Sequence, residues 1–184
     1  MTAISRIFHV FAAMAAICVA VTPAAVAQTQ TRVDASRDWS VFEATQNGTK
    51  VCWIVSMPTK SVALRGGNQV EVRRGDIFLM VANRVSESRP GENATNEVNF
   101  VAGYPFKAGS EVEVTVGSES FTMFTDGENA WTPSPSEDQK LVSAFRRGVN
   151  ARVEGVSSRG TTTVDTFSLL GFTAALESAT GRCG

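Results

Sequence analysis

The sequence predicts a mainly β protein, an antiparallel β-sandwich that carries one short helix. Short runs rich in β-branched and aromatic residues recur along the chain, and some alternate apolar and polar residues at period two, as in "EVEVTV" at 111–116. Turn signals that contain glycine or asparagine separate these runs. One segment alone carries clear start and stop signals of a helix. Many short strands and a lone helix are typical of a β-sandwich.

The first 27 residues are typical of a secretory signal peptide. Arg6 precedes an apolar block at 7–21, Pro23 breaks that block, and small residues follow at 25–27. We expect cleavage between Ala27 and Gln28. An uncleaved membrane anchor is the alternative, but the block has about 15 residues, fewer than the roughly 20 that a spanning helix needs.

Two units remain after that cleavage. Residues 28–37 are polar and are expected to form a flexible leader, and 38–184 are expected to form one domain. The mature chain carries 16 basic and 18 acidic residues, a net charge of −2. That balance argues against a general attraction to nucleic acid or to an anionic membrane.

The cysteines and the histidine also point to export. The chain has three cysteines and one histidine, and Cys18 and His9 lie in the signal segment. Cys52 and Cys183 remain, and an even count in an oxidising compartment predicts a disulfide, with two unpaired thiols as the alternative. A mature chain without histidine cannot use a Ser-His-Asp triad or a histidine-ligated zinc site.

The strands follow from alternation and turn signals. Runs at 39–45 and 50–57 flank Asn47-Gly48, which favours a tight hairpin because both residues tolerate positive φ. The second run is apolar on both faces, which predicts a central strand. Further strands are expected at 69–73, 76–84, 96–106, 111–117, 120–125, 150–157 and 161–170.

The helix follows from its capping residues. Ser134 and Glu137 form a capping box around Pro135, which suits the first helical position. Arg146 and Arg147 lie near the negative end of the helix dipole, and Gly148 is the expected stop. Residues 171–179 are interpreted as a short helical turn.

Candidate chemistry is sparse. Asp126, Glu128 and Asp165 are the carboxylates that an enzyme of unrecognised type would use, provided that the fold gathers them in a cleft. The acidic stretch at 126–129 lacks the spacing of a calcium loop. The sequence therefore predicts no catalytic residue, no cofactor, no cofactor-binding residue and no metal ligand.

Two basic motifs suggest binding. Arg74-Gly75-Asp76 matches the tripeptide that integrins recognise, which makes an adhesin an alternative function, although Asp76 opens a predicted strand and favours a turn. A C-terminal basic cluster could contact anionic lipid or polysaccharide. Its members are Arg146, Arg147, Arg152 and Arg159.

Stretches across nearly all of the mature chain resemble the invasion-associated locus B family of exported alphaproteobacterial proteins. The stretches are "KVCWIVSMP", "RGDIFLMVANR", "NEVNFVAGYPF", "GENAW", "LVSAFRRG", "SSRGTTTVDTFSLLGFTAALE" and the C-terminal "RCG". The resemblance implies an immunoglobulin-like sandwich, a periplasmic, outer-membrane-associated or secreted location, and no established catalytic residues.

The expected function is that of a non-enzymatic envelope protein. It would bind an envelope or host-surface protein, with peripheral membrane association, and contribute to host-cell invasion or to envelope integrity. Nucleic acid is not an expected partner, and the sequence leaves the oligomeric state open.

Overall fold

A computed structural model describes residues 30–46, 48–84 and 95–183. The expected signal peptide, its cleavage site between Ala27 and Gln28, and Asn47 of the hairpin lie outside the described residues.

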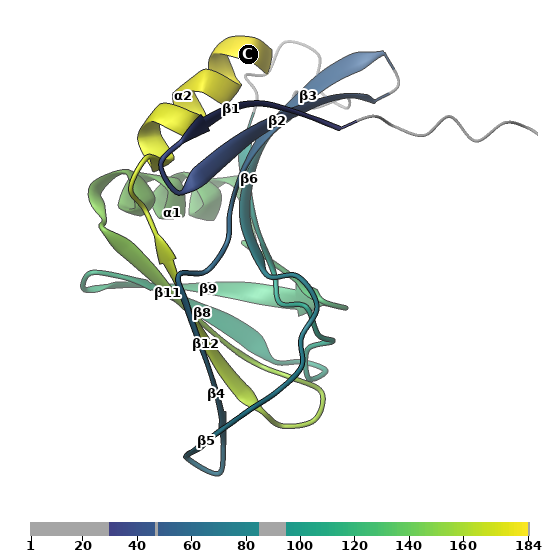
Figure 1. Ribbon diagram of the computed structural model, residues 1–184, viewed down its shortest axis with the longest axis vertical. Helices are drawn as coiled ribbons and strands as arrows, with labels where there is room; N and C mark the ends of the chain where they lie inside the picture. Colours follow the sequence, from purple (N-terminus) through teal and green to yellow (C-terminus); the bar gives the residue numbers. More distant parts are fainter. Residues whose placement is uncertain (1–29, 47, 85–94, 184) are drawn as a thin grey trace, which may run out of the picture.

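Twelve antiparallel strands form one open sheet, in the spatial order β1-β2-β3-β6-β7-β10-β9-β8-β11-β12-β4-β5 (Figure 1). The strands are β1 (Thr31–Ser36), β2 (Trp39–Gln46), β3 (Thr49–Ser56), β4 (Lys60–Arg65), β5 (Asn68–Val70), β6 (Phe78–Arg84), β7 (Thr95–Val101), β8 (Glu111–Val116), β9 (Glu119–Asp126), β10 (Asn129–Trp131), β11 (Asn150–Val156) and β12 (Thr162–Ser168). The helices are α1 (Pro135–Arg147) and α2 (Phe172–Cys183).

The sequence was expected to give two stacked sheets of immunoglobulin type with one helix, and the structure has one sheet with two helices instead. Alternation identifies strands, but it does not say which strands pair. After β3 the connection at 57–59 takes the chain to β4, which pairs with β12 rather than with β3. The Thr59 amide donates to the Thr166 carbonyl at 2.8 Å and fixes this crossover.

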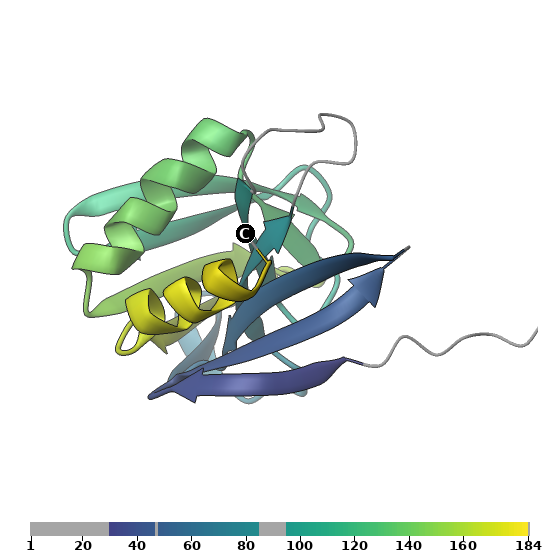
Figure 2. The same ribbon diagram turned by 90° about the horizontal axis from the view of Figure 1, so that it is seen from above.

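Both helices lie side by side on the same face of the sheet, and the curved sheet places the core on that face (Figure 2). Trp39 of β2 and Phe145 of α1 each pack edge-on against Phe172 of α2, with ring centroids 5.0 and 5.3 Å apart. Such edge-to-face contacts add to the apolar burial that holds helices and sheet together. The prediction that 50–57 forms a central strand is confirmed, because β3 lies between β2 and β6.

The prediction of α1 is confirmed by its capping contacts. The Ser134 hydroxyl accepts from the Glu137 amide, and the Gly148 amide donates to the Ala144 carbonyl. Helix α2 is longer than the short turn that was expected. Its buried face, Ala175, Leu176 and Ala179, packs on the sheet, so tertiary burial rather than a capping signal supports it.

The flexible leader expected over 28–37 is wrong for the described part of that range. Residues 31–36 form β1, which pairs with β2 through a register shift between Arg32 and Asp34. Val33 packs partly against the core, and Asp34 accepts a hydrogen bond from the Ser178 hydroxyl of α2 at 2.6 Å. The sequence did not predict this strand because, of its six side chains, only Val33 packs against the core, and the alternation of apolar and polar residues is therefore missing.

Candidate functional site

The core has a polar end on strand β12. Thr163, Asp165 and Phe167 alternate along the strand and point to the buried face. Phe167 lies in the apolar core, whereas Asp165 and Thr163 contact polar side chains. Asp165 pairs with Arg74 of the β5–β6 connection, and the Thr163 hydroxyl bonds to Tyr104 of the segment after β7.

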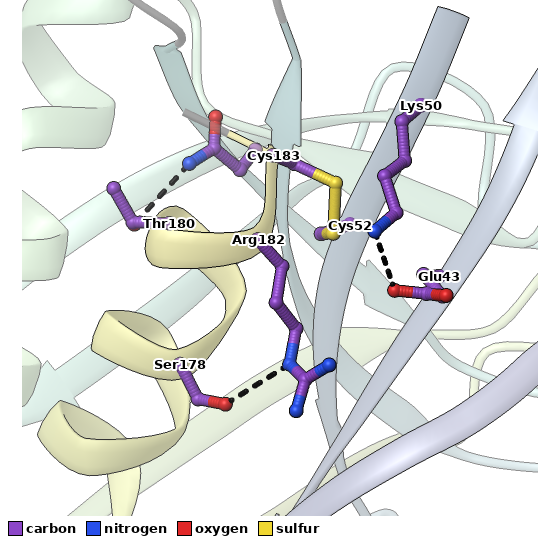
Figure 3. The surroundings of a disulfide bond; sticks show 8 residues. Glu43, Lys50, Cys52, Ser178, Thr180, Arg182 and Cys183 are labelled. Atoms are coloured by element: carbon purple, nitrogen blue, oxygen red, sulfur yellow. Dashed lines mark hydrogen bonds and ion pairs between the residues drawn. A yellow bond between two sulfur atoms is a disulfide. The ribbon is translucent and has the colours of Figure 1, made fainter.

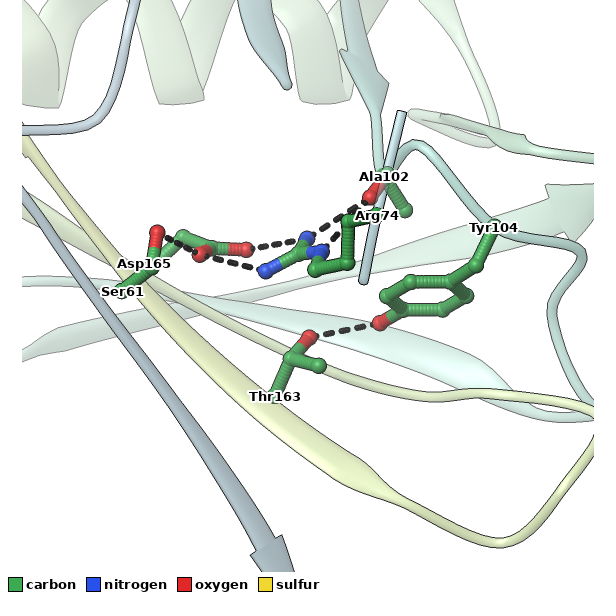
Figure 4. Close-up of polar contacts among 6 residues, drawn as sticks. All are labelled: Ser61, Arg74, Ala102, Tyr104, Thr163 and Asp165. Atoms are coloured by element: carbon green, nitrogen blue, oxygen red, sulfur yellow. Dashed lines mark hydrogen bonds and ion pairs between the residues drawn. The ribbon is translucent and has the colours of Figure 1, made fainter. Parts of the chain in front are cut away.

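A buried ion pair forms the centre of this polar end (Figure 4). Two guanidinium nitrogens of Arg74 donate to the two carboxylate oxygens of Asp165 at 2.8 and 2.7 Å. Their side chains are 8% and 0% exposed. Both partners make further hydrogen bonds, because Arg74 donates to the Ala102 carbonyl and Ser61 donates to Asp165 at 2.6 Å. A buried pair of charges is tolerated when its geometry is bidentate and its other polar atoms are satisfied.

Tyr104 lies against this ion pair. Its ring lies 4.9 Å from the Arg74 guanidinium carbon, within the range of a cation–π contact. Its hydroxyl is 2.6 Å from the Thr163 hydroxyl. Burial raises the pKa of the Tyr104 phenol, so the side chain stays neutral and able to donate a hydrogen bond.

Gly103 brings the two covering segments together. The Gly75 amide donates to the Gly103 carbonyl at 2.9 Å, and Gly103 has φ +68°. A Cβ at Gly103 would lie 2.6 Å from the Gly75 carbonyl oxygen. Glycine is therefore required at position 103 for two reasons: its φ is positive, and the Gly75 backbone lies too close to leave room for a side chain. It also ends β7 at Val101, five residues earlier than the strand predicted over 96–106.

A cavity of about 490 Å³ lies over the ion pair. Its wall combines the end of β4, the β5–β6 connection, the segment after β7 and the β11–β12 turn. We call it the arginine cavity, because four arginines line it together with two carboxylates, Tyr104 and several hydroxyl groups. These arginines and carboxylates are Arg65, Arg73, Arg74, Arg159, Glu71 and Glu128.

The integrin-type tripeptide does not form an exposed recognition loop. Arg74 is held by Asp165 and Ala102 in the interior, while Asp76 is exposed. An adhesin of that type needs both charged side chains at the surface. The adhesin alternative is therefore wrong for Arg74-Gly75-Asp76.

The three candidate carboxylates do not converge. Asp165 is buried in the ion pair, Glu128 lines the arginine cavity, and Asp126 lines a separate cavity of about 520 Å³ beside Phe124 and Trp131. A shared catalytic cleft of these three residues is thus not present. Among the described residues, no three cysteine, histidine or acidic side chains gather as a metal site would require.

The four arginines of the predicted C-terminal basic cluster do not lie together either. Arg146, Arg147 and Arg152 each pair at the surface with an acidic residue, at 3.5, 3.0 and 2.5 Å. The fourth member, Arg159, lies apart from them in the wall of the arginine cavity. Of the four arginines in this predicted cluster, therefore, only Arg159 lines the arginine cavity.

Cys52 and Cys183 form the predicted disulfide (Figure 3). The bond ties the last turn of α2 to the middle of β3, with Cα atoms 5.7 Å apart and a separation of 131 positions in the chain. Cys52 is fully buried, and Cys183 is 9% exposed. Nearby, the Asn83 amide donates to the Thr180 hydroxyl at 3.2 Å. The end of α2 is thereby fixed both covalently and by hydrogen bonding.

Sequence reasoning missed most of the arginine cavity. Arg65, Arg73 and Tyr104 come from separate turns, and no local spacing connects them. One signal was available: Thr163, Asp165 and Phe167 alternate, so a carboxylate occupies the inward face of a strand. A carboxylate in that position needs a buried cation, and arginine is the usual partner.

The described residues contain no helix with both the length and the apolar character needed to cross a bilayer. No curated protein matches the chain in sequence. The fold is similar to that in the crystal structure of invasion associated protein B from Bartonella henselae, with a TM-score of 0.53 and 16% identity. That match covers 81% of this chain and 95% of the other. The family model described as invasion associated locus B (IalB) protein matches residues 39–180, which is most of the sequence, and the chain therefore belongs to the IalB family.

Proposed function

We propose that the chain is an exported, non-catalytic envelope protein, periplasmic or attached to the outer membrane, and that the arginine cavity is where it binds its partner. The construction of this cavity carries the proposal. Arg74, held by Asp165 in a bidentate ion pair, lines this cavity, and charged side chains from four separate segments contribute to its wall. Ligand sites commonly combine such a preformed concave shape with a few convergent polar groups.

Export is supported by the disulfide. Disulfides are stable in oxidising compartments such as the periplasm and are rare in the cytosol. The sequence signals at 1–27 point to the same location. Fractionation of the native host, followed by intact-mass measurement, tests this part. We expect an envelope-associated species that begins at Gln28 with both thiols oxidised, and a cytosolic species with free thiols would contradict it.

A non-catalytic role is supported by the separation of Asp126, Glu128 and Asp165 described above. A contribution to host-cell invasion or to envelope integrity is proposed from family membership and from the name of the Bartonella protein. A deletion strain complemented with Asp126→Asn should behave like one complemented with the native chain, because Asp126 lies outside the arginine cavity. Loss of function in this variant would favour the enzyme alternative.

Photocrosslinking in intact cells tests the binding site. A photoreactive phenylalanine analogue replaces Val72, which lines the arginine cavity and is 39% exposed. Val149, 65% exposed and outside the cavity wall, is the matched control position. We expect a discrete envelope adduct from position 72 that is absent from position 149. Equal adducts at both positions, or none at either, would contradict the assignment of the cavity.

A further inference from the structure

The arginine cavity contains guanidinium groups that pair with no acidic side chain among the described residues. Arg74 is paired with Asp165, and Arg65 donates through one nitrogen to the Thr161 hydroxyl at 2.9 Å. Within the described part of the chain, Arg73 and Arg159 have no acidic side chain within ion-pairing distance. Both are exposed. The donor groups of these arginines therefore remain available to a ligand.

These arginines come from three different elements and line one cavity, so they do not form a single row on one strand or helix. Arg65 lies at the end of β4, Arg73 in the β5–β6 connection and Arg159 in the β11–β12 turn, all in the wall of one cavity. Arginine is suited to binding carboxylate and phosphate groups because its planar fork donates two parallel hydrogen bonds. The wall also contains the Ser158 hydroxyl, whereas the buried hydroxyls of Ser157 and Thr163 already bond to the Thr161 amide and the Tyr104 hydroxyl.

Two carboxylates restrict the choice of ligand. Glu71 and Glu128 also line the cavity, so a simple polyanion would meet repulsion there. An ionised carboxylate has no hydrogen-bond donor of its own, so it accepts hydrogen bonds from groups such as hydroxyls. A ligand that carries one oxyanion and several hydroxyl groups satisfies both sets of side chains at once.

We infer that the arginine cavity binds an oxyanion, a carboxylate or a phosphate, carried on a hydroxylated ring of the sugar type. This inference rests on the proposed function, because it names the ligand class of the same cavity. Arg65, Arg73 and Arg159 bind the oxyanion, whereas Glu71, Glu128 and the Ser158 hydroxyl bind the ring hydroxyls. The buried Arg74–Asp165 pair positions these groups and does not itself contact the ligand.

Titration of the ¹⁵N-labelled, disulfide-bonded protein with four probes tests the inference. The probes are glucuronate, glucose 6-phosphate, inorganic phosphate and glucose. Shifts are followed at the amides of Gly103, Ser158 and Thr163, which line the cavity, against Gly117 and Gly181 outside it. We expect the two anionic sugars to shift the cavity amides and to bind at least tenfold more tightly than phosphate or glucose. The relative affinity of glucuronate and glucose 6-phosphate distinguishes a carboxylate from a phosphate source.

Charge-neutralising variants complete the test. Arg73→Gln and Arg159→Gln should each weaken binding of the better anionic sugar by about tenfold, since each removes a charge-assisted hydrogen bond. Both positions are exposed, so folding should be unaffected. Arg147→Gln, a surface arginine paired with Glu119 outside the cavity, is the matched control and should leave binding unchanged.

Several results would overturn the inference. They are glucose binding as tightly as the anionic sugars, phosphate alone binding as tightly as glucose 6-phosphate, unchanged affinity in both arginine variants, or no shift of the cavity amides with any probe. A crosslinked partner at position 72 together with any of these results would preserve the proposed function and reject the ligand class. If neither a crosslinked partner nor binding of an anionic sugar is found, the proposed function and the ligand class are both rejected.

Discussion

At the scale of single residues, the buried Arg74–Asp165 pair shows how charge is accommodated in a β core. The two side chains are nearly without solvent contact, and each uses its remaining polar atoms on Ser61 or Ala102. Such a pair contributes little net stability compared with apolar residues of similar volume, but removal of one partner leaves an uncompensated buried charge. We propose that its role is to fix the position of Arg74 in the cavity wall.

Replacement of one partner tests this role. Arg74→Met should lower the free energy of unfolding by about 3–5 kcal/mol, because Asp165 then remains buried and unpaired. The double variant Arg74→Met with Asp165→Leu should recover most of that loss, since no buried charge remains. Urea denaturation measures both. A single-variant loss below about 1 kcal/mol would show that water already reaches the pair.

Gly103 gives a second test at this scale. Gly103→Ala must adopt a left-handed conformation and also displace the Gly75 carbonyl. Gly117→Ala has a similar φ of +60° with no heavy atom within 4 Å of its Cβ, so it isolates the conformational cost of about 1–2 kcal/mol. The Gly103 variant should therefore unfold at distinctly lower urea concentration than the Gly117 variant. Equal midpoints would mean that the 71–77 segment moves freely.

At the scale of elements, the prediction succeeded where the signal was local. Helix α1 has its capping box and stop signal in sequence, and β2 and β3 are joined by two residues, so both could be located. Strand β1, strand β4 and helix α2 lack such signals, and each packs on a part of the chain that is distant in sequence. For β1 this is α2, for β4 it is β12, and for α2 it is the sheet. Local patterns therefore predicted strands but not the single sheet, and they singled out Asp165 and Arg74 separately without predicting their ion pair.

Asp138 connects α1 to the sheet and makes this connection sensitive to pH. Its carboxylate accepts hydrogen bonds from the Val98 amide of β7 at 2.8 Å and from the Thr132 hydroxyl. Burial raises the pKa of Asp138 above its usual value, and the two hydrogen bonds oppose that rise only partly. A raised folded pKa means that the stabilising contribution is complete below the unfolded pKa. It is lost as pH rises through the folded pKa.

Asp138→Asn should remove this dependence. The variant is neutral at every pH and can still accept both hydrogen bonds through its amide oxygen. Its stability relative to the native chain should therefore increase as pH is raised from about 4 towards neutrality. Glu137→Gln, a neighbouring side chain at the surface, is the control and should show no such trend. Thermal unfolding across this pH range measures the difference, and parallel curves for native and Asp138→Asn protein would contradict it.

At the scale of the whole molecule, the Cys52–Cys183 disulfide closes nearly the entire described chain. A loop of 131 residues corresponds to about 5 kcal/mol in the chain-entropy account, which is an upper figure for the native bond. Reduction should therefore lower the unfolding midpoint substantially. The double variant Cys52→Ser with Cys183→Ser is the control and should be insensitive to reductant. A native midpoint that reductant does not alter would show that the packing of α2 alone suffices.

The place of β4 in the sheet has a consequence for how the protein is made. Residues 60–65 are synthesised early, yet their backbone partner on one side is 162–168, near the other terminus. When the chain is delivered with its N-terminus first, this edge of β4 stays without its strand partner until residues 162–168 have been made. Pairing of β4 with β12 is then a late and non-local step, and such steps are intrinsically slow. Until that step the unpaired edge is a place where another chain could add a strand.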